Sequence, residues 1–255
     1  MRAASVALAR RALRNFFRRP QLLAPLVLFP TMLLAVNVGG LERTTTLDGF
    51  PRVDGFLDFQ LAAALTQSLL LGGVSTGIAA ALDIEGGFFD RLVASPTPRL
   101  AIVLGRVIAA SVIAALQVVY FLGLGLIFGA SIKGGVVGVL CVLAIGIVAG
   151  TGFGALGMMI ALRARNASTV QGIFPLVLVI LFVSSAFFPA NLLSSPADVA
   201  AAYNPLSYIA DGLREPIAFG NALAPMLEGL AAAGGVALAA TSLSVLALRG
   251  RLREA

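Results

Sequence analysis

Long apolar segments separated by short polar ones run through the whole chain. A membrane-spanning helix needs about 20 predominantly apolar residues. Six segments come close to this length, and the pattern predicts a transmembrane helix in each of them: Leu22–Gly40, Phe59–Leu82, Ile102–Phe128, Val136–Leu162, Val170–Phe188 and Met226–Leu248. We therefore expect an all-α integral membrane protein, with a single transmembrane domain over residues 1–255.

The segment before the first span predicts a helix along the membrane surface. At about 100° per residue, Val6, Leu13 and Phe16 gather on one side and arginines fill the adjoining sector. Basic amphipathic helices tend to lie in the membrane interface. We expect such a helix over residues 4–19, with a plain positively charged flank as the alternative. The first apolar run is longer than that of a signal peptide, which favours a retained anchor.

Residues 189–225 are moderately apolar, but five prolines interrupt them. Ser195-Pro196 and Asn204-Pro205 each predict an N-cap followed by proline at the first helical position. Two short helices with apolar bodies suggest a re-entrant pair in the outer part of the membrane. Backbone of this kind survives at membrane depth only when it is buried in protein or lines a cavity. A folded extracytoplasmic loop is the alternative.

Composition and charge support the membrane assignment and add an orientation. Hydrophobic residues make up 59% of the chain and charged residues 12%, against about 25% charged in soluble domains. The net charge of +6 would suggest nucleic acid in a soluble chain. In a membrane protein, basic residues mark the cytoplasmic ends of spans. Fourteen of the 18 lysines and arginines fall on one side of the predicted topology, so we expect both termini in the cytoplasm and no nucleic-acid partner.

Several kinds of chemistry lack the residues that they require. The chain has no histidine and only one cysteine, Cys141, which argues against a metal site and a Ser-His protease. The only lysine, Lys133, lies outside any phosphate-binding loop, so the chain cannot hydrolyse a nucleotide by itself. Asp83 and Glu228 fall at span ends, where we expect them to be solvated rather than part of a proton relay. We expect no catalytic residue, metal or bound cofactor.

Two local patterns concern packing and partners. Glycines four residues apart predict close helix contacts at Gly73/Gly77, Gly125/Gly129 and Gly146/Gly150/Gly154. After the second span, Gly86-Gly87 and Pro96 bracket a short predicted helix whose Phe88 and Leu92 share one face. An exposed apolar face on such a helix indicates a partner protein. The alternative is an ordinary interhelical loop.

These segments also carry a resemblance that covers essentially the whole chain. The second connection reads Glu85-Gly86-Gly87-Phe88-Phe89-Asp90-Arg91-Leu92-Val93-Ala94-Ser95-Pro96, and Arg106 follows in the third span. The late segment reads Asn204-Pro205-Leu206-Ser207-Tyr208, followed by Gly212-Leu213-Arg214. In these features the chain resembles ABC type-2 exporter permeases, most closely the daunorubicin-resistance-type permeases of actinobacteria. Phe88-Phe89 stand where many of those relatives are more polar, which leaves the identity of the ATPase partner open.

The resemblance implies a half-transporter in a bacterial plasma membrane. Two copies, or this chain and a similar permease, would join two separate ATPase subunits that bind ATP and Mg. A coupling helix over residues 86–96 would contact the ATPase through Glu85, Gly86, Phe88, Arg91, Leu92, Ser95 and Pro96. The cargo would be a hydrophobic drug or a lipid. Export of a lipid-linked glycan or envelope lipid is an alternative. A lipid-modifying enzyme and a secondary carrier fit less well, because clustered carboxylates and intramembrane charges are missing.

Polar residues inside the apolar spans are candidates for the transport path. They are Asn37, Gln67, Ser75, Gln117 and Tyr120. Hydrogen bonding between helices is the alternative role for each of them. At the re-entrant segment, Asn204, Pro205 and Tyr208 are candidates for a gate above that path.

Overall fold

The computed structural model describes residues 1–251, which form helices joined by short connections, with no β-strand among them. The elements are α1 (Arg2–Phe17), α2 (Pro20–Leu41), η1 (Glu42–Thr46), α3 (Phe56–Glu85), α4 (Phe88–Ala94), α5 (Arg99–Ile127), α6 (Gly135–Ala164), α7 (Ala167–Gly172), α8 (Phe174–Phe182), η2 (Ala190–Leu192), α9 (Ala197–Tyr203), α10 (Pro205–Arg214), η3 (Glu215–Phe219) and α11 (Leu223–Arg251).

Five helical segments are long and apolar enough to cross a membrane: α2 with η1, α3, α5, α6 and α11. They match five of the six predicted spans. At the predicted span Val170–Phe188 the structure has a shorter apolar segment, made of α7 and α8. Pro175 has no N–H for the carbonyl of Gln171, so the helix is interrupted at Ile173. It ends at Phe182, where the hydroxyl of Ser184 donates to the carbonyl of Leu181 at 2.5 Å.

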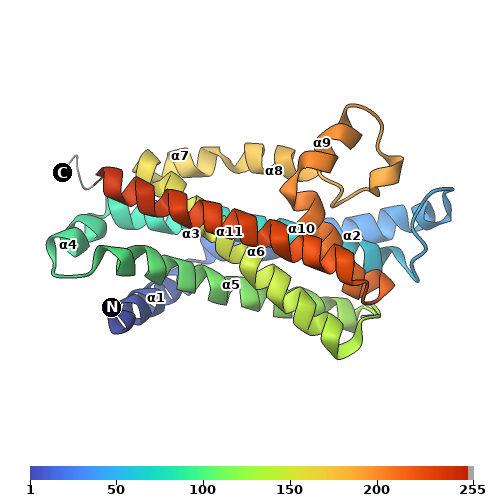
Figure 1. Cartoon of the computed structure of the whole chain (residues 1–255), viewed down its shortest axis with the longest axis horizontal. Helices are drawn as coiled ribbons and strands as arrows, with labels where there is room; N and C mark the ends of the chain where they lie inside the picture. The colour runs from blue at the N-terminus through green and yellow to red at the C-terminus, as the bar shows by residue number, and fades with distance from the viewer. Residues whose placement is uncertain (252–255) are drawn as a thin grey trace.

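The chain between α6 and α11 passes along the bundle in pieces (Figure 1). α6 ends at the same end of the bundle as α1, α4 and the end of α11. We call this the arginine-rich end, because most arginines of the chain lie in or beside these elements. α11 begins at the opposite end, so the intervening residues must traverse the bundle. They do so through α7–α8 and α10, while α9 projects from the side.

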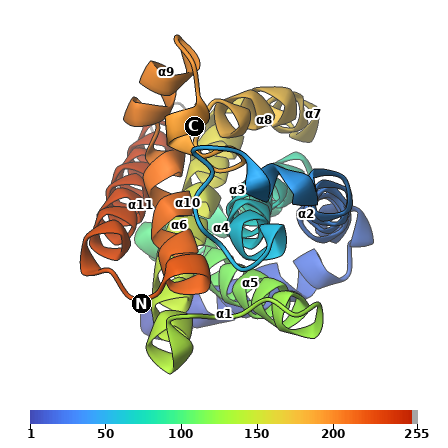
Figure 2. The ribbon, with the colours of Figure 1, turned by 90° about the vertical axis from the view of Figure 1, so that its right-hand side faces the viewer.

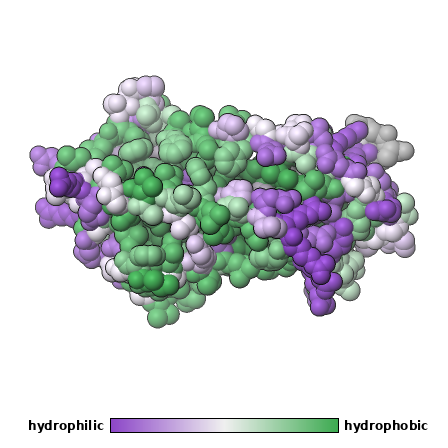
Figure 3. Space-filling model, turned by 180° about the vertical axis from the view of Figure 1, so that it is seen from behind, coloured by the Kyte–Doolittle hydropathy of each residue, from purple (hydrophilic) through white to green (hydrophobic). Residues whose placement is uncertain are grey.

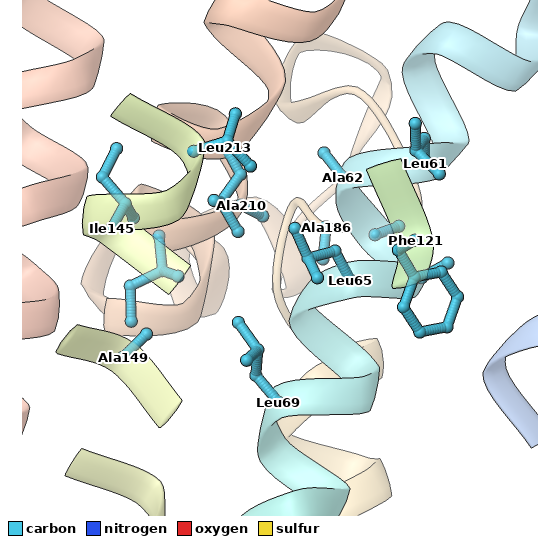
Figure 4. Close-up of a cluster of buried hydrophobic side chains, with 14 of the residues drawn as sticks. Leu61, Ala62, Leu65, Leu69, Phe121, Ile145, Ala149, Ala186, Ala210 and Leu213 are labelled. Carbon is cyan, nitrogen blue, oxygen red and sulfur yellow. The ribbon is translucent and has the colours of Figure 1, made fainter. Parts of the chain in front are cut away.

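α3 lies at the centre of the bundle, packed among α2, α5, α6 and α10 (Figure 2). About three quarters of its residues are buried for this reason. Its leucines meet side chains from α5, α6 and α10 in the main hydrophobic core (Figure 4). The labelled members include Leu65 and Leu69 of α3, Phe121 of α5, Ile145 of α6 and Leu213 of α10.

Glycines allow the closest helix contact of the core, between α3 and α6. A Cβ atom added at Gly77 would lie 2.9 Å from the Cα of Gly157, so only bare backbone fits at this crossing. The predicted packing face at Gly73/Gly77 is confirmed. The prediction for Gly129 is wrong: it follows α5 in a turn with φ +90° and has no neighbour within 4 Å.

On the face drawn in Figure 3, apolar residues cover most of the middle, and polar residues gather toward both ends. Large exposed apolar side chains on α2 and α11, such as Val36 and Leu238, belong to the exposed apolar surface. Such a surface is unfavourable in water and suits a bilayer. Together with the five long apolar helices, it identifies a multi-pass membrane protein.

The helix predicted over residues 4–19 is found as α1, which packs against α5. Its buried positions are Ser5, Ala9, Ala12 and Phe16, so three small residues and one phenylalanine turn toward the bundle. A Cβ at Gly105 of α5 would lie 2.7 Å from the Cβ of Leu8, which explains the close approach. The location of α1 in the membrane interface stays a prediction.

Candidate functional site

A buried ion cluster joins three helices at the arginine-rich end. Asp83, near the end of α3, accepts hydrogen bonds from Nη1 and Nη2 of Arg11 on α1, at 3.0 and 3.2 Å. Its Oδ2 atom also pairs with Arg106 of α5. The Asp83 side chain is only 10% exposed, so the expectation that it would be solvated is wrong. Because one carboxylate pairs with two guanidinium groups on different helices, it holds α1 and α5 against α3.

The short helix α4 is attached to this cluster through its two phenylalanines. Gly87, with φ +67°, allows the turn between α3 and α4. The guanidinium of Arg11 stacks on the ring of Phe88, 3.3 Å from the centroid. Arg251, at the end of α11, stacks on Phe89 at 4.5 Å and pairs with Asp90 at 3.0 Å. The predicted helix between Gly87 and Pro96 is therefore present, and its position is fixed by α1 and α11.

The apolar face of α4 turns toward its own chain. Phe89 is buried, and Leu92 packs against the core cluster around it. Phe88 is half-buried. The expectation of an exposed Phe88–Leu92 face is thus wrong, because helix periodicity gives which residues share a face and not where that face points. The exposed residues of α4 and of its flanks are Glu85, Gly86, Asp90, Arg91, Ala94 and Pro96.

The remaining residues of this connection bind nearby backbone. Ser95 donates to the carbonyl of Leu92 at 2.7 Å and ends α4. Glu85 accepts from the N–H of Ala167 at 2.9 Å and so connects α3 to the start of α7. Contact of these residues with an ATPase is a prediction, since the structure contains this chain alone.

A second polar site lies where α8, α10 and the chain between them meet α3. Asn204 caps α10 as predicted, because its Oδ1 accepts from the N–H of Leu206 at 3.0 Å. Its Nδ2 donates to the carbonyl of Ile180 at 2.8 Å and joins α10 to α8. The hydroxyl of Tyr208 donates to the carbonyl of Ala202. The predicted cap at Ser195 is wrong: α9 begins at Ala197, with Pro196 in the N-cap position.

Arg214 is the buried centre of this second site. It donates to the carbonyls of Ser185 and Ala186, at 3.3 and 2.5 Å, and pairs with Asp211. Its guanidinium also stacks on Phe59 of α3, at 4.1 Å. These two carbonyls belong to the non-helical backbone after α8. Arg214 supplies the hydrogen-bond donors that a continued helix would otherwise give them. Sequence reasoning missed this role, although a lone arginine three residues after Asp211 in an apolar helix is a usable signal.

The five candidate path residues do not form one site. Gln117 donates to the carbonyl of Ser68 at 2.6 Å, and the hydroxyl of Tyr120 lies 3.2 Å from that of Thr31. These two bind neighbouring helices, which is the alternative role considered for them. Gln67 is fully buried, and neither of its polar side-chain atoms has a hydrogen-bond partner.

The other two candidates lie on α2 and α3. Asn37 is half-buried on α2. Ser75 lines a groove of about 770 Å³ between α2, α3 and α7–α8.

One comparison with known proteins bears on these two sites. The family model described as "ABC-2 type transporter" matches residues 4–217, which include α4, the ion cluster and Arg214. No curated protein matches the sequence of the chain.

Proposed function

Because the chain belongs to the ABC-2 type transporter family, we propose that it exports a hydrophobic drug-like or lipid cargo from the cytoplasm or inner leaflet. It is a transmembrane subunit of an ABC transporter, and such subunits normally work with an ABC ATPase partner. In our proposal two ATPase subunits bind ATP and Mg and supply the energy. A second permease chain, identical or similar, completes the transporter in a bacterial plasma membrane.

The observation that supports this mechanism most directly is the attachment of α4 to the bundle. Arg11 contacts both Phe88 and Asp83, and Arg251 contacts both Phe89 and Asp90. An ATPase that moves α4 would therefore also displace α1, α3, α5 and α11. The exposed residues of the segment Glu85–Pro96, which include Glu85 at the end of α3 and Arg91 on α4, supply the contact surface for the ATPase in this proposal.

The topology follows from the same proposal. We assign the arginine-rich end to the cytoplasm. α7–α8 and α10 together then make the sixth crossing, which leaves both termini in the cytoplasm. Asn204, Pro205 and Tyr208, at the start of α10, and Arg214, at its end, form a gate toward the outer side. The resemblance of Glu85–Pro96 to daunorubicin-resistance-type permeases favours a drug-like cargo, with a lipid-linked glycan or envelope lipid as the alternative.

Charge reversal on α4 tests the docking role. Arg91 is exposed on α4, and Arg43 is exposed near the opposite end. We expect Arg91→Glu to reduce copurification of the ATPase about tenfold, which corresponds to roughly 1.4 kcal/mol. Arg43→Glu serves as the matched control and should not change it. Equal ATPase recovery with both variants would exclude docking on this side of α4.

Direction and cargo need a transport assay. Inverted membrane vesicles that contain the permease and its ATPase should accumulate a fluorescent anthracycline when ATP and Mg are added outside. Vesicles with Arg91→Glu should accumulate much less. Failure of the wild-type vesicles to accumulate the dye would refute the drug-like cargo, and transfer of a labelled lipid would then be the next measurement.

A further inference from the structure

An apolar cavity of about 310 Å³ lies behind α8. Its walls come from α3, α6, α7–α8 and α11 and from the start of α10. Every residue that lines it is apolar or glycine. Typical members are Leu70 and Val74 of α3, Leu156 and Ile160 of α6, and Val177 and Ile180 of α8.

The cavity extends along one half of the bundle. Its lining on α7–α8 runs from Val170 to Ile180, a rise of about 15 Å at 1.5 Å per residue. This equals one leaflet, since the hydrocarbon core of a bilayer is about 30 Å thick. Pro205 and Leu206 line the far end, where Asn204 bonds to the carbonyl of Ile180. The cavity therefore belongs to the leaflet at the arginine-rich end.

The chemistry of the lining restricts what can occupy this space. Water needs two to four polar partners, and the lining offers no polar side chain. An empty cavity would cost the lining its dispersion contacts. Leu176 and Ile180 are among the exposed lining residues, so hydrocarbon from the bilayer can reach the cavity from the side.

We propose that this cavity binds one acyl chain of a membrane lipid from the leaflet at the arginine-rich end. Its length of one leaflet and its wholly apolar lining fit an extended hydrocarbon chain. A helix from a second copy of this protein is about 10 Å across and too wide for the space behind α8. The site contains none of the residues proposed to contact the ATPase, and it shares Pro205 with the proposed gate.

Two substitutions on α8 form a matched test of this site. Val177 lines the cavity, whereas Val179, two residues further along, is 57% exposed and lies outside the lining. The chain would be purified in detergent from vesicles of phosphatidylcholine and phosphatidylglycerol, and the retained lipid counted by mass spectrometry. Val177→Phe fills the cavity and should retain about one lipid fewer per chain than the wild type. Val179→Phe should match the wild type, and equal retention by all three proteins would overturn the proposal.

A fluorescence measurement tests the site while the side chains of α8 stay unchanged. The chain contains no tryptophan, so a single introduced tryptophan reports on its surroundings. Leu156→Trp lies on the cavity wall, Leu238→Trp on the exposed surface of α11, and Phe121→Trp in the closed core. In vesicles of phosphatidylcholine brominated in the middle of its chains, quenching at residue 156 should approach that at residue 238. Quenching as weak as at residue 121 would mean that protein, not lipid, covers the cavity.

Discussion

Replacing Asp83 by asparagine should loosen the arginine-rich end of the bundle. The Asp83 side chain is 10% exposed, and the variant leaves Arg11 and Arg106 facing each other without a counter-charge. Breaking a buried ion pair by removing one partner costs about 3–5 kcal/mol. Arg11 is 35% exposed, so solvent screens part of the loss and the lower figure applies. In a protein of this size about 3 kcal/mol corresponds to a lowering of the melting temperature by roughly 6–12 °C.

The matched control is Asp90→Asn. Asp90 also pairs with an arginine, but its side chain is 67% exposed, and such pairs contribute about 0–1 kcal/mol. Thermal unfolding of the purified complex in detergent, followed by circular dichroism, compares the two variants. Asp83→Asn should also lower cargo-stimulated ATP hydrolysis more than basal hydrolysis. If both variants melt at the same temperature, Asp83 does not hold α1 and α5 on α3, and the coupling route through it is wrong.

Three further predictions concern the membrane orientation, the role of Arg214 and helix packing. A cysteine at Thr45 should react in intact cells with an impermeant thiol reagent and one at Ser95 should not; the reverse pattern would invert the topology. Arg214→Leu leaves buried carbonyls without donors, at about 1–3 kcal/mol each, so the melting temperature and transport should both fall; unchanged transport would refute the gate. Gly157→Leu clashes with the backbone of α3, whereas Gly234→Leu points into open space; equal expression of the two folded variants would contradict the assigned packing.

The sequence predicts the helices well where their signals are local. The apolar runs identify α5, α6 and α11, because length and composition alone decide whether a segment can span a bilayer. Gly87 and Pro96 bracket α4 correctly, and Asn204-Pro205 marks the start of α10. Each of these features depends on residues close in sequence, so no knowledge of the tertiary fold is needed.

The features that could not be predicted depend on distant residues. Asp83 meets Arg11 across 72 positions of sequence, and nothing local distinguishes it from a solvated carboxylate at a helix end. The burial of Phe89 depends on α11, whose end returns to α4 after the whole bundle has formed. The break after Phe182 is stable because Arg214 supplies donors to it. A run of apolar residues in the sequence does not show that a distant arginine will supply these hydrogen-bond donors.

The central position of α3 has a consequence for biogenesis. α3 is the most buried of the five long helices and has the lowest mean hydropathy, since other helices surround it. It also buries Asp58, Gln60 and Gln67, which lipid alone would solvate poorly. During synthesis it leaves the ribosome before α5, α6 and α10 exist. We expect α3 to remain beside the insertion machinery until α5 and α6 emerge, so that a nascent chain halted after α4 becomes a target for membrane proteases.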